Sequence, residues 1–504
     1  MSSGVSSGVQ GTTRVFLVVV MSAAAALLAA SLLVIMSDDD PIPDDGEGVT
    51  HQLWPDADPT TRRRTDRVRA RGGEGEDWDD DVVFIGGDPR DPNGPIFTVS
   101  ADSIRKAIEV RHWEEIRRMI DVFQRNGEEI PADIVESLIA FFDGEDTRLD
   151  AVLALGQVTS DAAGLALAAR ASNVSWPIEV RMAALDALAK NGSAAALTTV
   201  RTLTSDPDTD PALLRHAYMA LGGIGGRDAG ASLVESLRAH QDDNLRGVIV
   251  TALGKSDGAG AVLAQTLREG RASGDDELVG MVVTVAHLHG ERADDELRRE
   301  IRRLIEDPSA TEFIESEVAR LGIRGSALSA AAAIGGDLLA PVVAYARDDT
   351  DGMRGIALHS LREARGDDAA VQISALLTQE RDERFESEVA VALGETRSFK
   401  ATDALVKLLD AESGNTRRAA ARSLTVNRDP KATKPILDRL DEETDYRTLI
   451  NYIDALGRIG ANEALPKLEE LRDSDEQRWK NVQNYIRRSI ARIKSGNPES
   501  TRMD

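Results

Sequence analysis

The sequence predicts an all-α protein, an α-solenoid of about ten two-helix repeats preceded by a transmembrane helix and a disordered linker. Three observations predict this fold class. An Ala-Leu pair recurs every 31–33 residues, apolar residues around each pair have helical spacing, and Gly, Asn or Asp follows shortly afterwards. A single helix pair of this size cannot bury its apolar face, so stacked copies must share one core.

Composition excludes several classes of protein. The chain has 504 residues, with 86 acidic and 60 basic side chains, a net charge of −26, few aromatics and no cysteine. Disulfides and thiolate metal sites are therefore excluded. A surface this negative repels phosphate backbones, so we expect no nucleic-acid partner.

The N-terminal region predicts a membrane anchor. After a short tail, residues 1–14, residues 15–36 form an uncharged apolar run of 22 residues. A helix of that length crosses a hydrocarbon core of about 30 Å. A cleaved signal peptide is the alternative, but its apolar stretch is normally roughly 7–15 residues with a small-residue cleavage site. Because Arg14 precedes the run and acidic residues 38–40 follow it, the body is expected to be extracytoplasmic, in the periplasm or at the cell surface.

Residues 37–100 have the composition of a flexible linker. The stretches "SDDDPIPDDGEG" and "GGEGEDWDDD" are rich in Pro, Gly and acid, and they lack apolar periodicity. The arginine-rich block at residues 62–71 either pairs with these acids or contacts anionic lipid or a partner.

The segments at both ends of the array are expected to cap it, because terminal repeats need atypical outer faces. Residues 101–145 predict two capping helices that carry much of the aromatic content. Residues 477–504 predict one amphipathic basic helix and a tail. The apolar side of this helix consists of Trp479, Val482, Ile486, Ile490 and Ile493.

The repeats themselves are predicted over residues 146–476. The leucine of the Ala-Leu pair falls at Leu155, Leu188, Leu221 and Leu253, and again at Leu361, Leu393, Leu424 and Leu456, with serine in place of alanine before Leu361 and Leu424. Each repeat has a first helix such as "EVRMAALDAL", a glycine-type stop, a second helix such as "ATDALVKLLD" and an acidic turn. The phase is lost between Ala286 and Leu361, although residues 328–349 still resemble a degenerate repeat.

The pattern "R-x-x-A-x-x-A-L-G-x-I-G", followed by "A-x-x-x-L-x-x-L", resembles the short HEAT-like repeat of the phycobilisome-lyase type, over roughly residues 145–475. Its best copies are residues 215–226 and 452–460. The resemblance implies a HEAT-like fold but does not fix the function, because this repeat serves enzymes, adaptors and scaffolds. The leading arginine resembles the residue that ties one turn to the acidic turn of the next repeat. It stands at Arg148, Arg181, Arg215, Arg246, Arg354, Arg417 and Arg447, with Asp206, Asp242, Asp243 and Asp410 as expected partners.

Two clusters are candidate metal sites. His287, His289 and Glu291 lie in "HLHGE", where they converge only if the helix ends at Gly290. The other cluster is the run of alternating carboxylates in "DPDTD", namely Asp206, Asp208 and Asp210. This run has the spacing that starts a calcium loop but lacks the following Gly and the later Glu, so a solvated turn is the simpler interpretation. We identify no catalytic residue and no cofactor-binding residue.

The favoured function is a membrane-tethered HEAT-repeat scaffold or adaptor at the cell envelope, not an enzyme and without a cofactor. Exposed positions on the second helices of successive repeats would bind a protein or peptide, and the acidic surface favours a basic partner. The alternative is an enzyme or a metal- or cofactor-binding HEAT-like protein with its site in the irregular region, residues 290–334.

Overall fold

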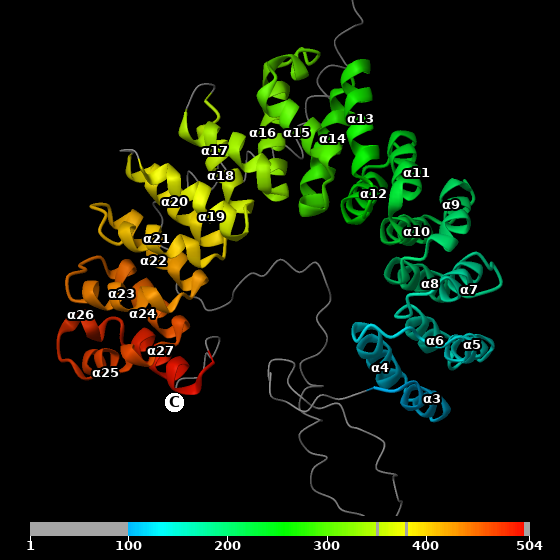
Figure 1. Ribbon diagram of the computed structural model, residues 1–504, viewed down its shortest axis with the longest axis horizontal. Coiled ribbons are helices and arrows are strands. Elements are labelled where there is room, and N and C mark those ends of the chain that lie inside the picture. Colours follow the sequence, from blue (N-terminus) through cyan, green and yellow to red (C-terminus); the bar gives the residue numbers. More distant parts are fainter. Residues whose placement is uncertain (1–98, 349–351, 379–381, 498–504) are drawn as a thin grey trace, which may run out of the picture. The chain divides into compact units, whose positions relative to one another are not determined.

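Paired helices stacked in chain order make up the protein. The computed structural model describes residues 99–348, 352–378 and 382–497, which belong to one compact unit, Ile96–Asp504. No strand occurs within these residues. The prediction of an all-α protein with about ten two-helix repeats is confirmed by ten successive pairs, from α6–α7 to α24–α25 (Figure 1).

The ten pairs form two sets of helices. The first helices are α6 (Arg148–Leu155), α8 (Ile178–Asn191), α10 (Pro211–Ile224), α12 (Asp243–Lys255), α14 (Asp276–His289), α16 (Glu317–Ile334), α18 (Arg354–Ser360), α20 (Glu383–Glu395), α22 (Gly414–Asn427) and α24 (Tyr446–Ile459). The second helices are α7 (Asp161–Ala171), α9 (Leu197–Ser205), α11 (Gly226–Ala239), α13 (Gly260–Ser273), α15 (Asp295–Glu306), α17 (Leu339–Arg347), α19 (Gly366–Ser374), α21 (Thr402–Leu408), α23 (Thr433–Leu440) and α25 (Leu465–Asp473). Each first helix contacts the first helix of the next repeat, in unbroken succession.

The glycine of the Ala-Leu-Gly motif explains how closely the first helices pack. A Cβ atom added at Gly222 in α10 would lie 2.6 Å from the backbone oxygen of Ala252 in α12. At the equivalent Gly156, it would lie 2.6 Å from the Cβ of Ala187. Gly222 lies within α10, and Gly156 follows α6 directly in the right-handed conformation. Both allow close approach, because an added Cβ would collide with the neighbouring helix. The residue that ends the helix is a later one, such as Gly460, in the left-handed conformation.

Three helices, rather than the two expected, precede the first predicted repeat. They are α3 (Ala101–Glu109), α4 (Trp113–Arg125) and α5 (Ala132–Ala140), followed by the 3-10 helix η3 (Phe141–Asp143). The α4 helix packs on α6, and α5 packs on α6 and α7, so this pair continues the stack, whereas α3 packs on α4 and α5. The chain breaks twice, because Arg111 adopts a positive φ of 57° between α3 and α4 and Gly127 a positive φ of 83° between α4 and α5.

The C-terminal segment forms two helices instead of one. The short α26 (Gln477–Lys480) ends before α27 (Gln483–Ser495), and the break lies at Asn481 and Val482. The predicted apolar side is nevertheless buried at all five positions, which are Trp479, Val482, Ile486, Ile490 and Ile493. The α27 helix packs on α24 and α25, where it covers the last repeat.

The irregular region is a longer copy of the repeat. The N–H of Gly290 after α14 bonds to Ala286, and the N–H of Gly335 after α16 bonds to Ala331 in the same way. These equivalent alanines are 45 residues apart, because the 3-10 helix η6 (Pro308–Thr311) follows α15 and because α16 has 18 residues. The stack therefore continues through residues 290–334.

The leading arginines agree only in part with the partners expected for them. Three of them donate to a backbone carbonyl shortly before their own helix: Arg148 Nε to Phe142 (2.9 Å), Arg181 Nε to Ala171 (2.8 Å) and Arg417 Nη1 to Ala411 (2.9 Å). Of the expected acidic partners, Asp242 instead caps α12 and Asp410 pairs with Arg439. Arg417 has both kinds of partner, because its guanidinium also binds Glu443 in the acidic turn before the next repeat, with Nε and Oε2 2.7 Å apart.

The expected membrane localisation is corrected. No helix in the described part of the chain is long and apolar enough to cross a membrane. The predicted tail, anchor and linker, residues 1–14, 15–36 and 37–100, lie outside the described residues except for the last two positions of the linker.

Candidate functional site

The predicted carboxylate cluster forms an exposed inter-repeat turn. Asp206 ends α9, and its carboxylate accepts the N–H of Asp208 at 3.0 Å. Asp210 caps the N-terminus of α10 by accepting the N–H of Ala212 at 2.8 Å. Two of the three carboxylates thus serve the backbone of their own turn.

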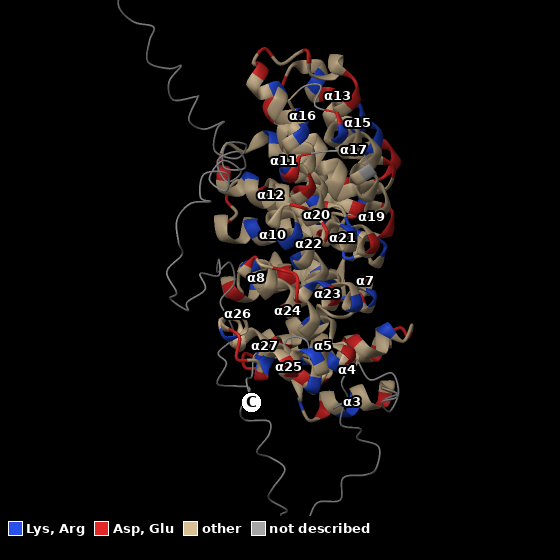
Figure 2. Cartoon of the chain, turned by 90° about the vertical axis from the view of Figure 1, so that its left-hand side faces the viewer, with Lys and Arg blue, Asp and Glu red and all other residues tan. Residues whose placement is uncertain are grey.

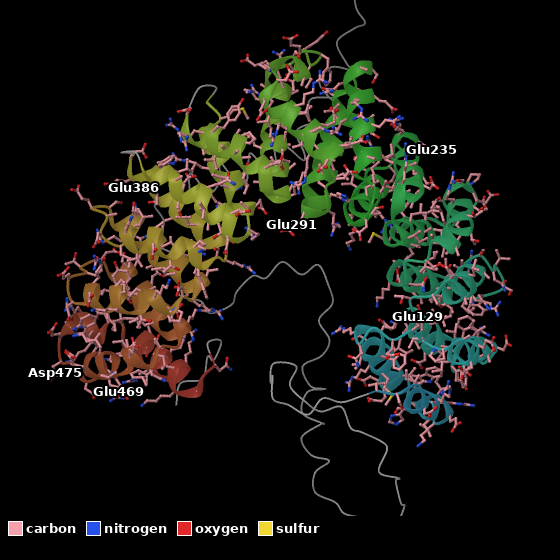
Figure 3. The ribbon with its side chains drawn as sticks, viewed as in Figure 1. Glu129, Glu235, Glu291, Glu386, Glu469 and Asp475 are labelled. Atoms are coloured by element: carbon pink, nitrogen blue, oxygen red, sulfur yellow. The ribbon has the colours of Figure 1, made fainter. Side chains whose placement is uncertain are left out.

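The two histidines and the glutamate near the end of α14 have different environments. His289 is 1% exposed, whereas His287 is only partly buried. Glu291 is exposed just beyond the helix (Figure 3). Within the described ranges, no group of three His, Cys, Asp or Glu side chains is placed to hold a metal ion. Burial, together with the nearby Arg292, lowers the pKa of His289, so this ring is neutral at pH 7.

A cleft lies on the first helices α20, α22 and α24. Its volume is about 920 Å³. The helices contribute both long side chains and short ones, such as Ala419. The lining consists of Val391, Arg397, Asn415, Arg418, Ala419, Arg422, Thr425, Val426, Arg428, Asn451, Asp454 and Arg458. The second helices bear a smaller hollow of about 240 Å³ between α17 and α19. The larger of these two cavities therefore lies on the first helices, whereas partner binding was expected on exposed positions of the second helices.

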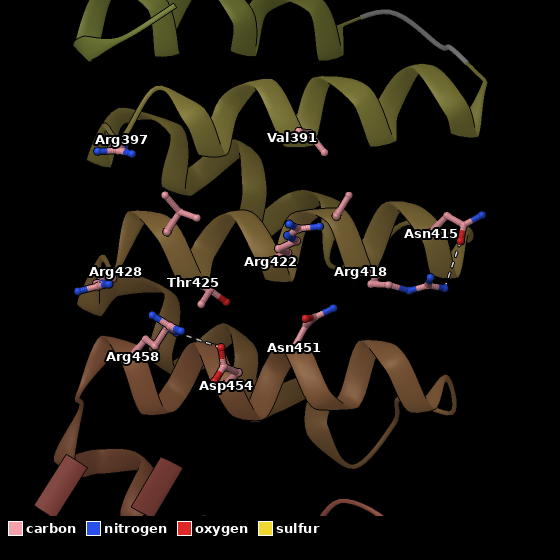
Figure 4. Close-up of a pocket in the computed structure, with 12 residues that line it drawn as sticks. Val391, Arg397, Asn415, Arg418, Arg422, Thr425, Arg428, Asn451, Asp454 and Arg458 are labelled. Atoms are coloured by element: carbon pink, nitrogen blue, oxygen red, sulfur yellow. Dashed lines mark hydrogen bonds and ion pairs between the residues drawn. The ribbon is translucent and has the colours of Figure 1, made fainter. Parts of the chain in front are cut away.

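The cleft runs along α22 (Figure 4). Arg397, Arg428 and Arg458 lie where the three helices end, Arg418 and Asn415 lie toward the opposite end, and Arg422 lies between the two groups. Asn415 and Arg428 are 13 residues apart, which corresponds to about 20 Å of helix.

Five arginines and one aspartate make up the charged lining of the cleft. Asp454 pairs with Arg458 at 3.1 Å and also with Arg492 of α27. Arg418 donates to the side-chain oxygen of Asn415 at 3.2 Å. In the part of the chain that the structure describes, the side chains of Arg397 and Arg422 have neither a hydrogen bond nor an ion pair, and both residues are exposed.

Two of these arginines occupy left-handed backbone conformations. Arg397 has a φ of 52° and Arg428 a φ of 54°. Arg428 ends α22 with its N–H bonded to Leu424, just as Gly460 ends α24 with its N–H bonded to Leu456. An L-residue other than Gly is less stable in this conformation by about 1–2 kcal/mol. The two arginines therefore add charge to the cleft at positions where glycine would be less strained.

The sequence contained a signal for this cleft that the repeat pattern obscured. In "NTRRAAARSLTVNR" the leading Arg417 matches the repeat, but Arg418 and Arg422 are four residues apart and so share one helix face. Arg428 stands where the best repeats have the terminating glycine. Each departure from the repeat pattern adds an arginine to the same cleft.

Comparison with known proteins supports the repeat fold. A family model described as HEAT repeats matches residues 165–254 and 402–483, which include α22 and α24 of the cleft. This match supports a HEAT-like repeat protein, whereas the phycobilisome-lyase type is not shown. No curated protein matches the chain.

Three of the solved structures that resemble the chain are at most 17% identical to it in sequence. An engineered protein is 17% identical, the match covering 71% of this chain and 98% of that one, with a TM-score of 0.25. Kap121p bound to Nup53p is 13% identical, the match covering 79% of this chain and 50% of that one, with a TM-score of 0.33. Human deoxyhypusine hydroxylase in complex with glycerol is 15% identical, the match covering 66% of this chain and 97% of that one, with a TM-score of 0.20. The chain spans about half the length of Kap121p.

Proposed function

We propose that the protein is a non-enzymatic scaffold whose first-helix face binds an extended segment of a protein partner. The observation that carries this proposal is the cleft along α22, which is open, elongated and bordered by three successive first helices. A cleft of this kind suits an extended chain, because neighbouring repeats present the same helix side by side. Its volume lies in the range of pockets that bury a ligand of moderate size, roughly 300–1,000 Å³.

The rest of the stack supports this role. The first helices are held together through buried alanines and glycines, for example Ala217 and Gly222, so their relative positions are fixed by close packing. Such a surface is preorganised, which reduces the entropy lost when a partner binds. Acidic and basic residues are interspersed over the repeats (Figure 2), so binding depends on local clusters rather than on net charge.

Site-specific photo-crosslinking in cells that make the protein tests this function. A photoreactive residue is placed at Asn415, which is exposed in the cleft, and separately at Asp438, which is exposed on the second helix of the same repeat. We expect a discrete protein adduct from position 415 and none from position 438. Equal adducts from both positions, or an adduct from position 438 alone, would contradict the assignment of binding to the first helices.

A further inference from the structure

We propose that the cleft between α20, α22 and α24 recognises an acidic segment of the partner, whose carboxylates pair with Arg422 and Arg397. This inference rests on the proposed function and adds the chemistry of the bound segment. It assigns to the cleft a preference opposite to the one expected from the net charge of −26, which favours a basic partner overall.

The charged side chains of the cleft favour an acidic ligand. The only acidic side chain in the cleft lining, Asp454, is already bound by Arg458 and Arg492. Arg422 projects from the middle of α22 and Arg397 follows α20, and neither has an ion pair among the residues the structure describes. Two planar guanidinium groups are thus left to bind carboxylates, which they do bidentately with good geometry.

A purely structural role does not account for Arg422. A cation near a helix C-terminus is stabilised by the helix dipole, and this effect applies to Arg397, Arg428 and Arg458. It does not apply to Arg422 in the middle of α22, whereas Arg418 forms an ion pair with Asp445 at 3.7 Å. The left-handed backbone of Arg397 also favours glycine, so the arginine is kept there at a cost in backbone strain.

The dimensions and lining of the cleft favour a peptide over a nucleic acid. An extended peptide covers the distance of about 20 Å along α22 with roughly six residues. Single-stranded nucleic acids are held by aromatic side chains on which bases stack, and none of the lining residues is aromatic. The strongly negative chain would also repel a polyphosphate backbone beyond the cleft.

Fluorescence anisotropy with the full-length chain tests the inference. The probe is a fluorescein-labelled peptide of ten residues with glutamate at every second position, and its control carries glutamine instead. Salt at about 150 mM screens the charge of the rest of the surface beyond about 8 Å. We expect the glutamate peptide to bind, the glutamine peptide to bind at least about tenfold more weakly, and added salt to weaken the difference.

Matched variants locate the binding. Arg422→Glu should weaken binding of the glutamate peptide at least about tenfold. Arg201→Glu makes the same change of charge at an exposed position on α9, a second helix, and should leave binding unchanged. Circular dichroism melting of both variants confirms that they fold, as expected for exposed side chains without partners.

Several results would overturn the inference. They are equal binding of the two peptides, no binding of the glutamate peptide, retained binding in Arg422→Glu, and tighter binding of an oligothymidine of ten nucleotides, which would assign the cleft to nucleic acid. If the glutamate peptide does not bind while position 415 still crosslinks to a partner, the preference for an acidic segment is refuted and the proposed function stands. If position 415 yields no adduct, the proposed function itself fails.

Discussion

Replacement of Gly222 by alanine tests the close packing of the first helices. An added Cβ would lie 2.6 Å from the backbone oxygen and 2.9 Å from the Cα of Ala252, closer than real Cβ atoms approach such atoms. Both contacts are backbone atoms of α12, so no side chain can rotate away. The α10 and α12 helices must instead separate by several tenths of an ångström, which disturbs every contact along their interface.

The magnitude follows from two opposing effects. Alanine in a helix interior is more stable than glycine by about 1 kcal/mol, and this gain is retained at an open site. Overpacking of a rigid core costs about 1–3 kcal/mol. We expect Gly222→Ala to destabilise the protein by about 0–2 kcal/mol net, near the upper end of this range because the obstacle is backbone.

Gly247→Ala is the matched control. Gly247 lies in the interior of α12, is exposed, and would have no atom within 4 Å of an added Cβ. This variant should be more stable by up to about 1 kcal/mol. Urea denaturation of the full-length chain gives the overall change, and hydrogen exchange gives the opening of α10 and α12, which matters because repeat arrays can unfold in parts. If Gly222→Ala stabilises the protein as much as Gly247→Ala, the account of close packing is refuted.

Three further predictions concern an ion pair, a buried ring and a strained backbone. Glu443 is buried and accepts from Arg417 at 2.7 and 2.9 Å; burial disfavours its charge, but Arg417 and two backbone N–H groups hold its pKa below the usual value. Arg417→Met should therefore lower the free energy of unfolding in urea by about 3–5 kcal/mol, and a loss below about 1 kcal/mol would contradict the role of this pair. The lowered pKa of His289 means that the unfolded chain binds a proton below about pH 6.5 that the folded chain does not. Stability should thus fall as the pH drops from 7.5 to 5.5, and His289→Leu should reduce this slope in urea titrations; an unchanged slope would exclude His289 as the cause. Arg397→Gly should leave the stability unchanged or raise it by up to about 1 kcal/mol. The same variant should bind the glutamate peptide more weakly in the anisotropy assay. A loss of stability would show that Arg397 serves the fold instead.

The repeat fold was predictable because its signals are local and recur. Helical spacing of apolar residues and a terminating residue such as Gly460 identify each helix without knowledge of its neighbours. The role of Gly222 was not predictable in the same way, because a glycine that ends a helix and one that permits close approach look alike in sequence. Similarly, the phase was lost after Ala286 because the insertion before α16 changes the interval without changing the packing.

The candidate site was harder to predict than the fold. It depends on which side chains remain exposed between neighbouring helices, and periodicity alone does not determine that. Arg418 and Arg422 are close in sequence, but Arg397 comes from the preceding repeat and Arg458 from the following one. The metal candidates failed to converge for a related reason, because His289 turns into the core while Glu291 stays in solvent.

The central claim is that the first-helix face, and specifically its arginines, holds the protein partner. The most direct measurement is the yield of the adduct from position 415 in cells, compared between the otherwise unchanged chain, Arg422→Glu and Arg201→Glu. We expect the adduct to be lost with Arg422→Glu and kept with Arg201→Glu. An adduct of equal yield in all three proteins would show that the partner binds without the arginine cleft.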